Sequence, residues 1–371
     1  MSRLPMLIQV IRQPQKLLTL TLHEQEQLVR QLRVEGLLAH IGYRLQQAQL
    51  WQQLSPELAQ AIESAMVHAD ERRRMLRWEV NRIRRALRSV KVPVILLKGA
   101  AYALSDLPNA RGRLVADVDI MLREEELPLV EAALEEHGWQ PTKLDAYDQN
   151  YYRQWMHEIP PLKHVGRLSE LDVHHTIIPK TSRLKPDVGA LWATARPLAG
   201  GEPQYNGLLT LAPAEMVLHA VVHLFQEDLY HGLRGLVDCD QLLRHYAAQE
   251  EDFWPQLILR AERLDLARPL SYALHFCQQL LGTPIPKATM VAAQQHGPSA
   301  PIRLLLYPLM ARMFHPQLGR VGHEDRLDLA ARLLLYIRAH WLRMPPGLLL
   351  SHLSRKGTRR WGPHVWHNRN R

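Results

Sequence analysis

The fold is decided by residues 98–122, KGAAYALSDLPNARGRLVADVDIML. They follow an apolar run at residues 92–97, which is short, rich in Val, Ile and Leu, and therefore typical of a buried strand. A short helix is expected at residues 100–105. A second strand is expected at residues 114–122, where Asp117 and Asp119 stand among apolar residues. The stretch therefore predicts a strand, a glycine turn with a short helix, and a second strand that carries two acids.

Asp117 and Asp119 are two residues apart on this second strand, so their carboxylates project from the same face. Neighbouring carboxylates repel each other unless a positive charge lies between them, and a divalent metal commonly supplies it. The alternative is a pair of surface acids at a strand edge, but the apolar neighbours on both sides indicate a buried strand. A glycine turn followed by paired aspartates suits metal-assisted phosphoryl or nucleotidyl transfer.

Such a metal site needs a third acid, and we predict that it is Asp172, in the alternating segment ELDVHH at residues 170–175. Glu170 lies on the same face by spacing and competes for the role. Acids of this kind can hold two metal ions about 3.5–4 Å apart, which clamp a triphosphate and activate a hydroxyl. Asp172 would accept the proton of that hydroxyl or bind the catalytic metal.

Basic residues stand on either side of the predicted turn. Lys98 and Gly99 end the first strand and offer a phosphate a point charge and close approach to the backbone. Arg111 and Arg113 precede the acidic strand, where they either neutralise phosphate or pair with the aspartates themselves. The sequence leaves both alternatives open.

The composition is that of a globular protein of 371 residues, with 46% hydrophobic and 22% charged residues. Two cysteines without a CxxC pair argue against a disulfide framework or a cysteine zinc site. We expect a cytoplasmic protein, because the sequence shows neither a signal peptide nor an apolar run near the roughly 18 residues of a membrane span. Six Lys or Arg residues and no acid lie in residues 354–371, so the net charge of +9 is concentrated there and nucleic acid is not the expected partner.

The hydrophobic pattern predicts an α+β fold, in which N-terminal and C-terminal helical regions flank a small mixed-sheet core. The expected regions are N-terminal helices in residues 1–90, the α/β core in 91–205, a C-terminal helical domain in 206–353 and a basic tail in 354–371. In the core, a helix is expected at 124–137 and further strands at 139–142, 163–165 and 168–174. In the C-terminal domain, helices are expected at 213–226, 232–248, 253–264, 267–281, 301–313 and 325–342.

Three helices carry further signals. Ser55 and Pro56 predict the start of a long helix, with the serine as its N-cap. One face of this helix carries an apolar stripe, namely Leu76, Val80, Ile83, Leu87 and Val90. The opposite face carries eight arginines between residues 72 and 88, which fit a solvated face or a phosphate-facing surface. In the last helix, apolar residues near arginines fit either a packed helix or, with the basic tail, contact with a membrane surface.

His219 and His223 are four residues apart on a predicted helix, a spacing that suits either a zinc site or a packed helix. Asp238 and Asp240 are expected to form an inter-domain ion pair or to contact substrate.

Together these motifs resemble the uncharacterised nucleotidyltransferase family of bacteria, within the DNA polymerase β-like nucleotidyltransferase superfamily. The resemblance covers roughly residues 35–350. The matching segments are LKG at residues 97–99, RLVADVDIML at 113–122, ELDVH at 170–174, and LAPAE at 211–215 through His219 and His223 to RGLVD at 234–238.

The resemblance implies a nucleotidyltransferase core that uses Mg²⁺ or Mn²⁺ and a nucleoside triphosphate such as ATP. It assigns Asp117, Asp119 and Asp172 to metal binding and catalysis. It assigns Lys98, Gly99 and Arg113 to nucleotide binding. The acceptor would carry a hydroxyl group, and the association of the family with polysaccharide biosynthesis suggests an acceptor without identifying it.

Superfamily members commonly have Gly-Ser where this chain has Gly99-Ala100, which loses a hydroxyl that usually touches phosphate. The segment from Gly99 to Asp117 is also longer than is typical. These departures suit the alternative function, a catalytically inactive binding or regulatory protein on the same fold.

Overall fold

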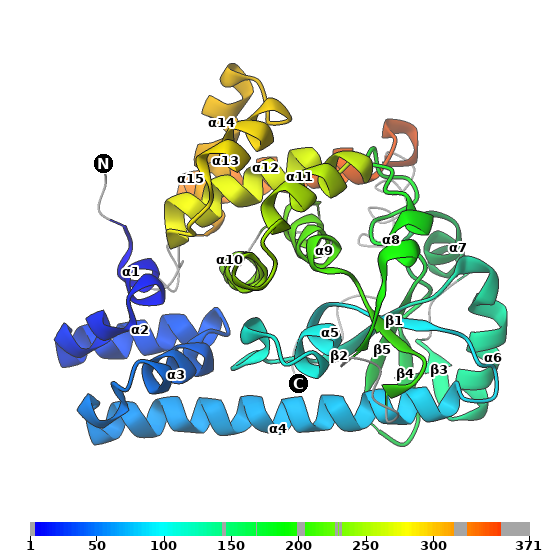
Figure 1. Cartoon of the computed structure of the whole chain (residues 1–371), viewed down its shortest axis with the longest axis horizontal. Coiled ribbons are helices and arrows are strands. Elements are labelled where there is room, and N and C mark those ends of the chain that lie inside the picture. Colours follow the sequence, from blue (N-terminus) through cyan, green and yellow to red (C-terminus); the bar gives the residue numbers. More distant parts are fainter. Residues whose placement is uncertain are drawn as a thin grey trace, which may run out of the picture.

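The computed structural model describes residues 4–142, 146–167, 169–198, 205–226, 229, 232–314 and 325–349. Within these residues the strands form one mixed sheet, and helices flank it on its N-terminal and C-terminal sides (Figure 1). The predicted α+β fold is confirmed. The basic tail at residues 354–371 lies outside the described residues.

The sheet is built on two parallel pairs of strands. Its strands are β1 (Val94–Leu96), β2 (Asp117–Met121), β3 (Trp139–Pro141), β4 (Leu162–His164), β5 (Glu170–His174), β6 (Arg196–Pro197) and β7 (Leu208–Thr210). Their order is β3-β4-β5-β2-β1-β7-β6. The pairs β2–β5 and β1–β7 are parallel, and the other neighbours are antiparallel. The sheet therefore reaches β7, beyond the expected core boundary at residue 205, and the division into domains stays a prediction.

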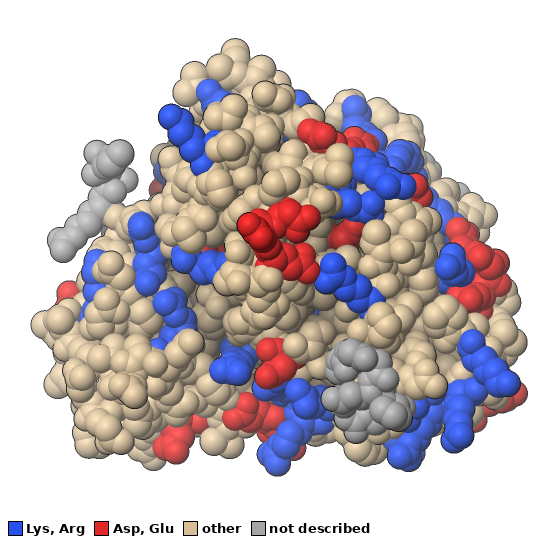
Figure 2. Space-filling model, in the orientation of Figure 1, with Lys and Arg blue, Asp and Glu red and all other residues tan. Residues whose placement is uncertain are grey.

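The N-terminal helices are α1 (Met6–Arg12), α2 (Leu22–Val34), α3 (Leu38–Gln47) and α4 (Pro56–Ala86). The helix α4 begins as predicted, because the Ser55 hydroxyl accepts a hydrogen bond from the Leu58 backbone N–H at 3.3 Å. It runs along one side of the molecule and packs against α3 and β2 (Figure 1). Its predicted apolar stripe is buried from Leu76 to Leu87. Figure 2 shows Lys and Arg mixed with acidic residues along the edge where α4 lies.

The core helices are α5 (Lys98–Leu104), α6 (Leu127–Glu136), α7 (Ala146–Trp155) and α8 (Val188–Thr194). The pattern did not predict α7 and α8. The strand expected at residues 114–122 begins only at Asp117, because the loop before it packs against α3. Gly112 lies in this loop with φ +73°, and a Cβ placed on it would meet the His40 backbone nitrogen at 2.3 Å. Only glycine fits this close approach.

The C-terminal helices are α9 (Pro213–Gln226), α10 (Leu233–Gln249), α11 (Phe253–Arg263), α12 (Ala267–Phe276), α13 (Lys287–Gln295), α14 (Ala300–Met313) and α15 (Arg326–Arg343). All the helices expected in this region are present, and α13 is an addition. The helix α12 continues as a π-helical turn, Cys277–Leu281, which ends at Gly282 with φ +68°. The helix α9 is buried on almost every side between α10, α11 and α12. The core is continuous from Leu7 to Leu335.

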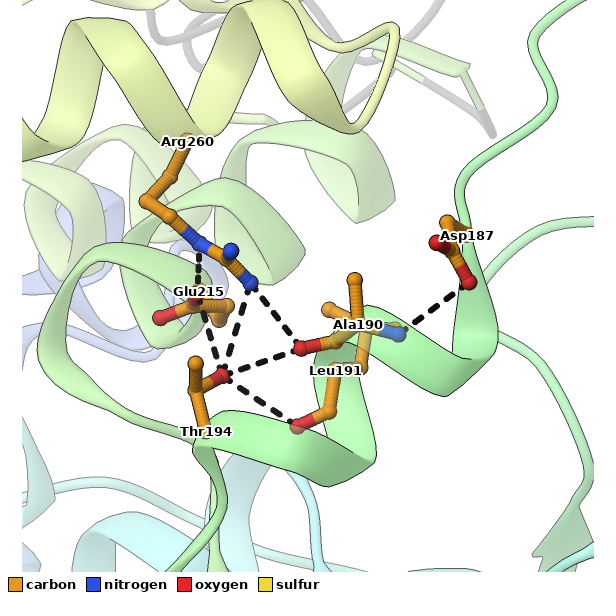
Figure 3. Close-up of polar contacts among 6 residues, drawn as sticks. All are labelled: Asp187, Ala190, Leu191, Thr194, Glu215 and Arg260. Atoms are coloured by element: carbon orange, nitrogen blue, oxygen red, sulfur yellow. Dashed lines mark hydrogen bonds and ion pairs between the residues drawn. The ribbon is translucent and has the colours of Figure 1, made fainter.

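A buried ion pair fixes α11 to α9 and α8 (Figure 3). Arg260 donates from Nε to Glu215, whose residue is only 2% exposed, and from Nη2 to the Ala190 carbonyl at 3.0 Å. The Thr194 hydroxyl donates to Glu215 Oε1 at 3.2 Å. With these contacts both buried charges are paired and hydrogen-bonded.

The last two helices expose large apolar side chains. In α15, Leu335 is buried, whereas Leu333, Leu334, Ile337 and Trp341 are about half exposed. In the neighbouring α14, Leu304 and Leu305 are exposed too. One face of α15 is thus packed, through Ala331, Leu335 and Ala339, and contact of the other face with a membrane surface stays a prediction. In the described part of the chain, every helix is too short or too polar to cross a membrane.

Replacing Arg260 with alanine leaves the Glu215 carboxylate buried without its partner, so we expect Arg260→Ala to lower the free energy of unfolding by about 3–5 kcal/mol. Urea denaturation followed by circular dichroism measures this. Arg263→Ala on the same helix is the matched control, since Arg263 is exposed, and it should stay within about 0.5 kcal/mol of the native protein. Equal losses in the two variants would contradict the role given to the ion pair.

Candidate metal and nucleotide site

Asp117, Asp119 and Asp172 come together because β2 and β5 run parallel in one register. Asp119 lies opposite Asp172, and Asp117 lies opposite Glu170. Residues in register on neighbouring strands point to the same face of the sheet. One carboxylate oxygen from each aspartate lies within 4.8 Å of the others. We call these three residues the aspartate trio.

Glu170, the competing candidate for the third acid, stands apart from the trio. It begins β5 and its carboxylate pairs with Lys163 Nζ at 2.5 Å, with nearly half of its side chain exposed. Asp172 lies two residues further along the strand, directly opposite Asp119 on β2. The geometry therefore favours Asp172 over Glu170 as the third acid.

Asp119 is the most buried member of the trio and has two partners of its own. Lys98 Nζ lies 2.8 Å from Asp119 Oδ1, and His174 Nε2 lies 3.1 Å from the same oxygen. Burial raises the pKa of Asp119, but the charges and hydrogen bonds of Lys98 and His174 outweigh it and hold this pKa well below its usual range. Asp119 is thus held ionised.

The other two aspartates carry the electrostatic cost of the arrangement. Burial and the negative charges of Asp119 and Asp117 raise the pKa of Asp172 to about 7. Burial and the charge of Asp119 raise the pKa of Asp117 as well. A divalent cation among these oxygens would relieve the repulsion, and carboxylates are the ligands that Mg²⁺ and Mn²⁺ prefer. The residues present fit the predicted metal.

Gly99 and Arg113 have structural contacts that the sequence did not reveal. A Cβ on Gly99 would lie 2.7 Å from Val115 Cγ1, so glycine lets α5 pack closely on the loop before β2. Arg113 pairs with Asp238 on α10 instead of with the trio, and Arg234 Nη2 lies 3.0 Å from the same carboxylate. Asp238 therefore forms the predicted ion pair between the core and the C-terminal helices. The roles of Gly99 and Arg113 in nucleotide binding stay predictions.

The remaining polar candidates do not belong to the trio, although His219 is close enough to Asp119 to be affected by its charge. Arg111 is half exposed, 3.9 Å from Asp106. Asp240 accepts hydrogen bonds from Thr283 at 2.6 Å and from Arg244 at 2.7 Å. His219 is buried in α9, and burial lowers its pKa well below the usual value. Neither His219 nor His223 belongs to the close metal-binding groups found among the described residues.

Two pockets lie near the trio, one beside Lys98 and one beside Asp117. One, of about 280 Å³, adjoins Lys98 and is lined mainly by polar and charged residues from α5, α9 and α10. We call it the cationic pocket; its charged lining residues are Lys98, Arg113, Arg234 and Asp238. The other, of about 460 Å³, lies between α4 and β2 beside Asp117 and contains the half-exposed side chains of Met75 and Trp78. We call it the α4 pocket.

The sequence prediction missed His174, His157 and Glu158, which lie next to the trio. His174 stands two residues after Asp172 on β5, so the alternation that selected Asp172 also places His174 on the same face. That signal was available. His157 and Glu158 lie in the connection between α7 and β4, and no periodicity marks them.

Comparison with known families gives one match. The model of the family described as "Uncharacterised nucleotidyltransferase" matches residues 22–282, which include the trio and both pockets. No curated protein and no solved structure matches the chain.

The raised pKa of Asp172 makes the stability of the metal-free protein depend on pH. Its pKa is about 7 in the folded protein against an ordinary value of 3.8, so over this range the folded state binds a proton that the unfolded chain releases. Stability therefore falls as the pH rises from about 4 to about 7. We expect Asp172→Asn to remove this part of the pH dependence and to raise the melting temperature of the metal-free protein at about pH 8 by several degrees.

The same variant should lose Mg²⁺ affinity by at least about tenfold, because a ligand is gone. Thermal melts with and without Mg²⁺ over a pH series measure both effects. Glu170→Gln removes the competing carboxylate, whose charge is the smallest of the causes acting on the Asp172 pKa, so it should change the pH profile only slightly and leave the Mg²⁺ affinity unchanged. A response of Glu170→Gln equal to that of Asp172→Asn would show that the third acid is misassigned.

Proposed function

The chain belongs to the uncharacterised nucleotidyltransferase family, and we propose that it moves a nucleotidyl group from a nucleoside triphosphate to a hydroxyl-bearing acceptor, using Mg²⁺ or Mn²⁺. We place its core in the DNA polymerase β-like superfamily. The observation that carries the proposal is the convergence of Asp117, Asp119 and Asp172 on two parallel strands. Three carboxylates at one point are the arrangement that this reaction needs.

Each member of the trio has a distinct part in this proposal. A bound metal would neutralise triphosphate charge and make the acceptor hydroxyl more acidic. Asp119, held ionised by Lys98 and His174, is a permanent metal ligand. Asp172, opposite Asp119, would accept the proton of the acceptor hydroxyl or bind the catalytic metal. The acceptor oxygen then bonds to the α-phosphorus and pyrophosphate leaves.

We assign the two substrates to different pockets. The cationic pocket suits the triphosphate, because Arg113 and Arg234 share one carboxylate, Asp238, and so leave one positive charge uncompensated within this group. The α4 pocket suits the acceptor, since Met75 and Trp78 offer apolar surface beside Asp117. An in-line displacement would require the acceptor hydroxyl to approach the α-phosphorus from the side opposite to the leaving pyrophosphate.

We expect Asp117→Asn to lower nucleotidyl transfer by at least roughly 100-fold, because it removes a metal ligand. The assay incubates the protein with each of the four ribonucleoside triphosphates and Mg²⁺ or Mn²⁺. It then measures pyrophosphate release, self-labelling and labelled products in a cell extract. Asp106→Asn is the matched control, since Asp106 is an exposed acid in the same stretch that pairs with Arg73 at the surface. It should retain native activity.

Metal-dependent nucleotide binding without pyrophosphate release from any triphosphate would overturn the transferase proposal. It would favour the alternative, an inactive nucleotidyltransferase fold that binds or regulates a partner, which the Gly99-Ala100 pair already suits. Calorimetric titration of nucleotide with Mg²⁺ separates the two outcomes. Failure of both binding and turnover would overturn both functions.

We further propose peripheral contact with an anionic membrane through α14 and α15. The specific observation is the row of half-exposed apolar side chains on these helices, which includes Leu333, Ile337 and Trp341. Arg183 lies 4.6 Å from the Trp341 ring centroid and is itself exposed, so a positive charge adjoins the apolar row. Apolar residues flanked by cations are the features that bind an anionic lipid surface.

Sedimentation with phosphatidylserine vesicles tests this contact. We expect the full chain to sediment with anionic vesicles, less with neutral ones, and Ile337→Ser or removal of residues 354–371 to reduce the bound fraction several-fold. Leu259→Ser, at an equally exposed leucine on α11, should sediment like the native protein. Equal sedimentation of the Ile337 and Leu259 variants would exclude α15 as the contact.

A further inference from the structure

A second group of metal-binding side chains lies against the aspartate trio. It consists of His157, Glu158 and His174, each of which offers one ligand atom within 4.8 Å of the other two. The segment with His157 and Glu158 is fixed to the end of β5. Glu158 pairs with His174 in an antiparallel bridge, and the His175 N–H donates to the His157 carbonyl at 2.9 Å. The three side chains are thus presented by hydrogen-bonded backbone.

The spacing of these side chains suits coordination of a shared cation. Glu158 Oε2 lies 3.6 Å from His174 Nε2 and 3.8 Å from His157 Nε2. Both distances are too long for hydrogen bonds. Ligands of a tetrahedral zinc ion, each about 2.0–2.2 Å from the metal, lie roughly 3.3–3.6 Å from one another. Small side-chain movements would therefore bring the three atoms around one ion.

Burial also favours a cation at this point. The exposed fraction of the side chain is 1% for His174, 8% for His157 and 15% for Glu158. In such a weakly solvated place a bound cation would be attracted strongly by the Glu158 carboxylate.

We propose that His157, Glu158 and His174 form a second metal site, which takes a transition-metal cation such as Zn²⁺. Imidazole is a ligand for Zn²⁺, Cu²⁺ and Ni²⁺, whereas Mg²⁺ favours oxygen ligands alone. Two histidines and one glutamate form a known zinc-binding set. The site is therefore chemically distinct from the aspartate trio, and it does not depend on the transferase proposal.

Asp119 connects the two sites. His174 Nε2 lies 3.1 Å from Asp119 Oδ1, and this nitrogen cannot both donate a hydrogen bond and bind a metal. Metal binding replaces this hydrogen bond and brings the ion next to the Asp119 carboxylate, which becomes available as a fourth ligand. The second site would thereby help Lys98 to hold Asp119 in place.

The test uses the full chain, stripped with a chelator, reloaded with Zn²⁺ or Co²⁺ and dialysed. We expect the native protein to retain stoichiometric metal by elemental analysis and Co²⁺ to show the visible absorption of a four- or five-coordinate site. His157→Gln and Glu158→Gln should each weaken the affinity by at least about 100-fold. Asp172→Asn, which alters only the trio, and His296→Gln, at a partly exposed histidine paired with Glu262, should retain the metal.

Thermal melting shows whether each variant is folded. Zn²⁺ should raise the melting temperature of the native protein, whereas His157→Gln should melt cooperatively and show no response to Zn²⁺. Absence of stoichiometric metal from the native protein, or full retention by both His157→Gln and Glu158→Gln, would overturn the proposal. Loss of metal from Asp172→Asn would do so as well, because it would place the ion in the trio.

Discussion

The parallel pairing of β2 with β5, with Asp119 opposite Asp172, is the constraint on which the site depends. It brings three carboxylates to one place on two neighbouring inner strands, beside buried apolar residues such as Val118 and Leu171. Carboxylates brought this close in a partly dry environment repel each other, so the surroundings must supply positive charge. Lys98 at the start of α5 supplies it to Asp119, and His174 at the end of β5 lies within hydrogen-bond distance of the same oxygen.

The negative charges of the three aspartates are not compensated equally, and this inequality points to the function. Asp119 receives both local partners, which hold its pKa low. The pKa of Asp172 stays raised to about 7 by burial and by the other two aspartates. The folded chain thus keeps an electrostatic cost at one carboxylate that an asparagine would avoid. Such a cost is typical of sites that are shaped for a ligand and not for maximal stability.

Alternation along single strands was enough to predict the pairs Asp117–Asp119 and Asp172–His174 in principle, because side-chain direction in a strand follows from spacing. The partners of these residues come from elsewhere in the chain and depend on register, which local patterns do not encode. Lys98 meets Asp119 from 21 residues away, and Arg113 meets Asp238 from 125 residues away. His157 and Glu158 lie in a connection without periodicity. Helices with long apolar stripes were predicted well, whereas the short α7 and α8 were missed.

The helical regions belong to the site and are more than attachments to a self-sufficient core. On α10, Asp238 and Arg234 line the cationic pocket, and Asp238 pairs both with Arg234 and with Arg113 from the core. Arg234 also donates to the Asn109 carbonyl at 2.7 Å, so one side chain ties α10 to the turn before β2. The strand β7, after the expected core boundary at residue 205, pairs with β1, which leads into Lys98. A core that ended at residue 205 would lack β7, which supports the strand leading into Lys98, and it would also lack Arg234. Its trio would keep the negative charge, but the pocket that is suited to a triphosphate would be incomplete.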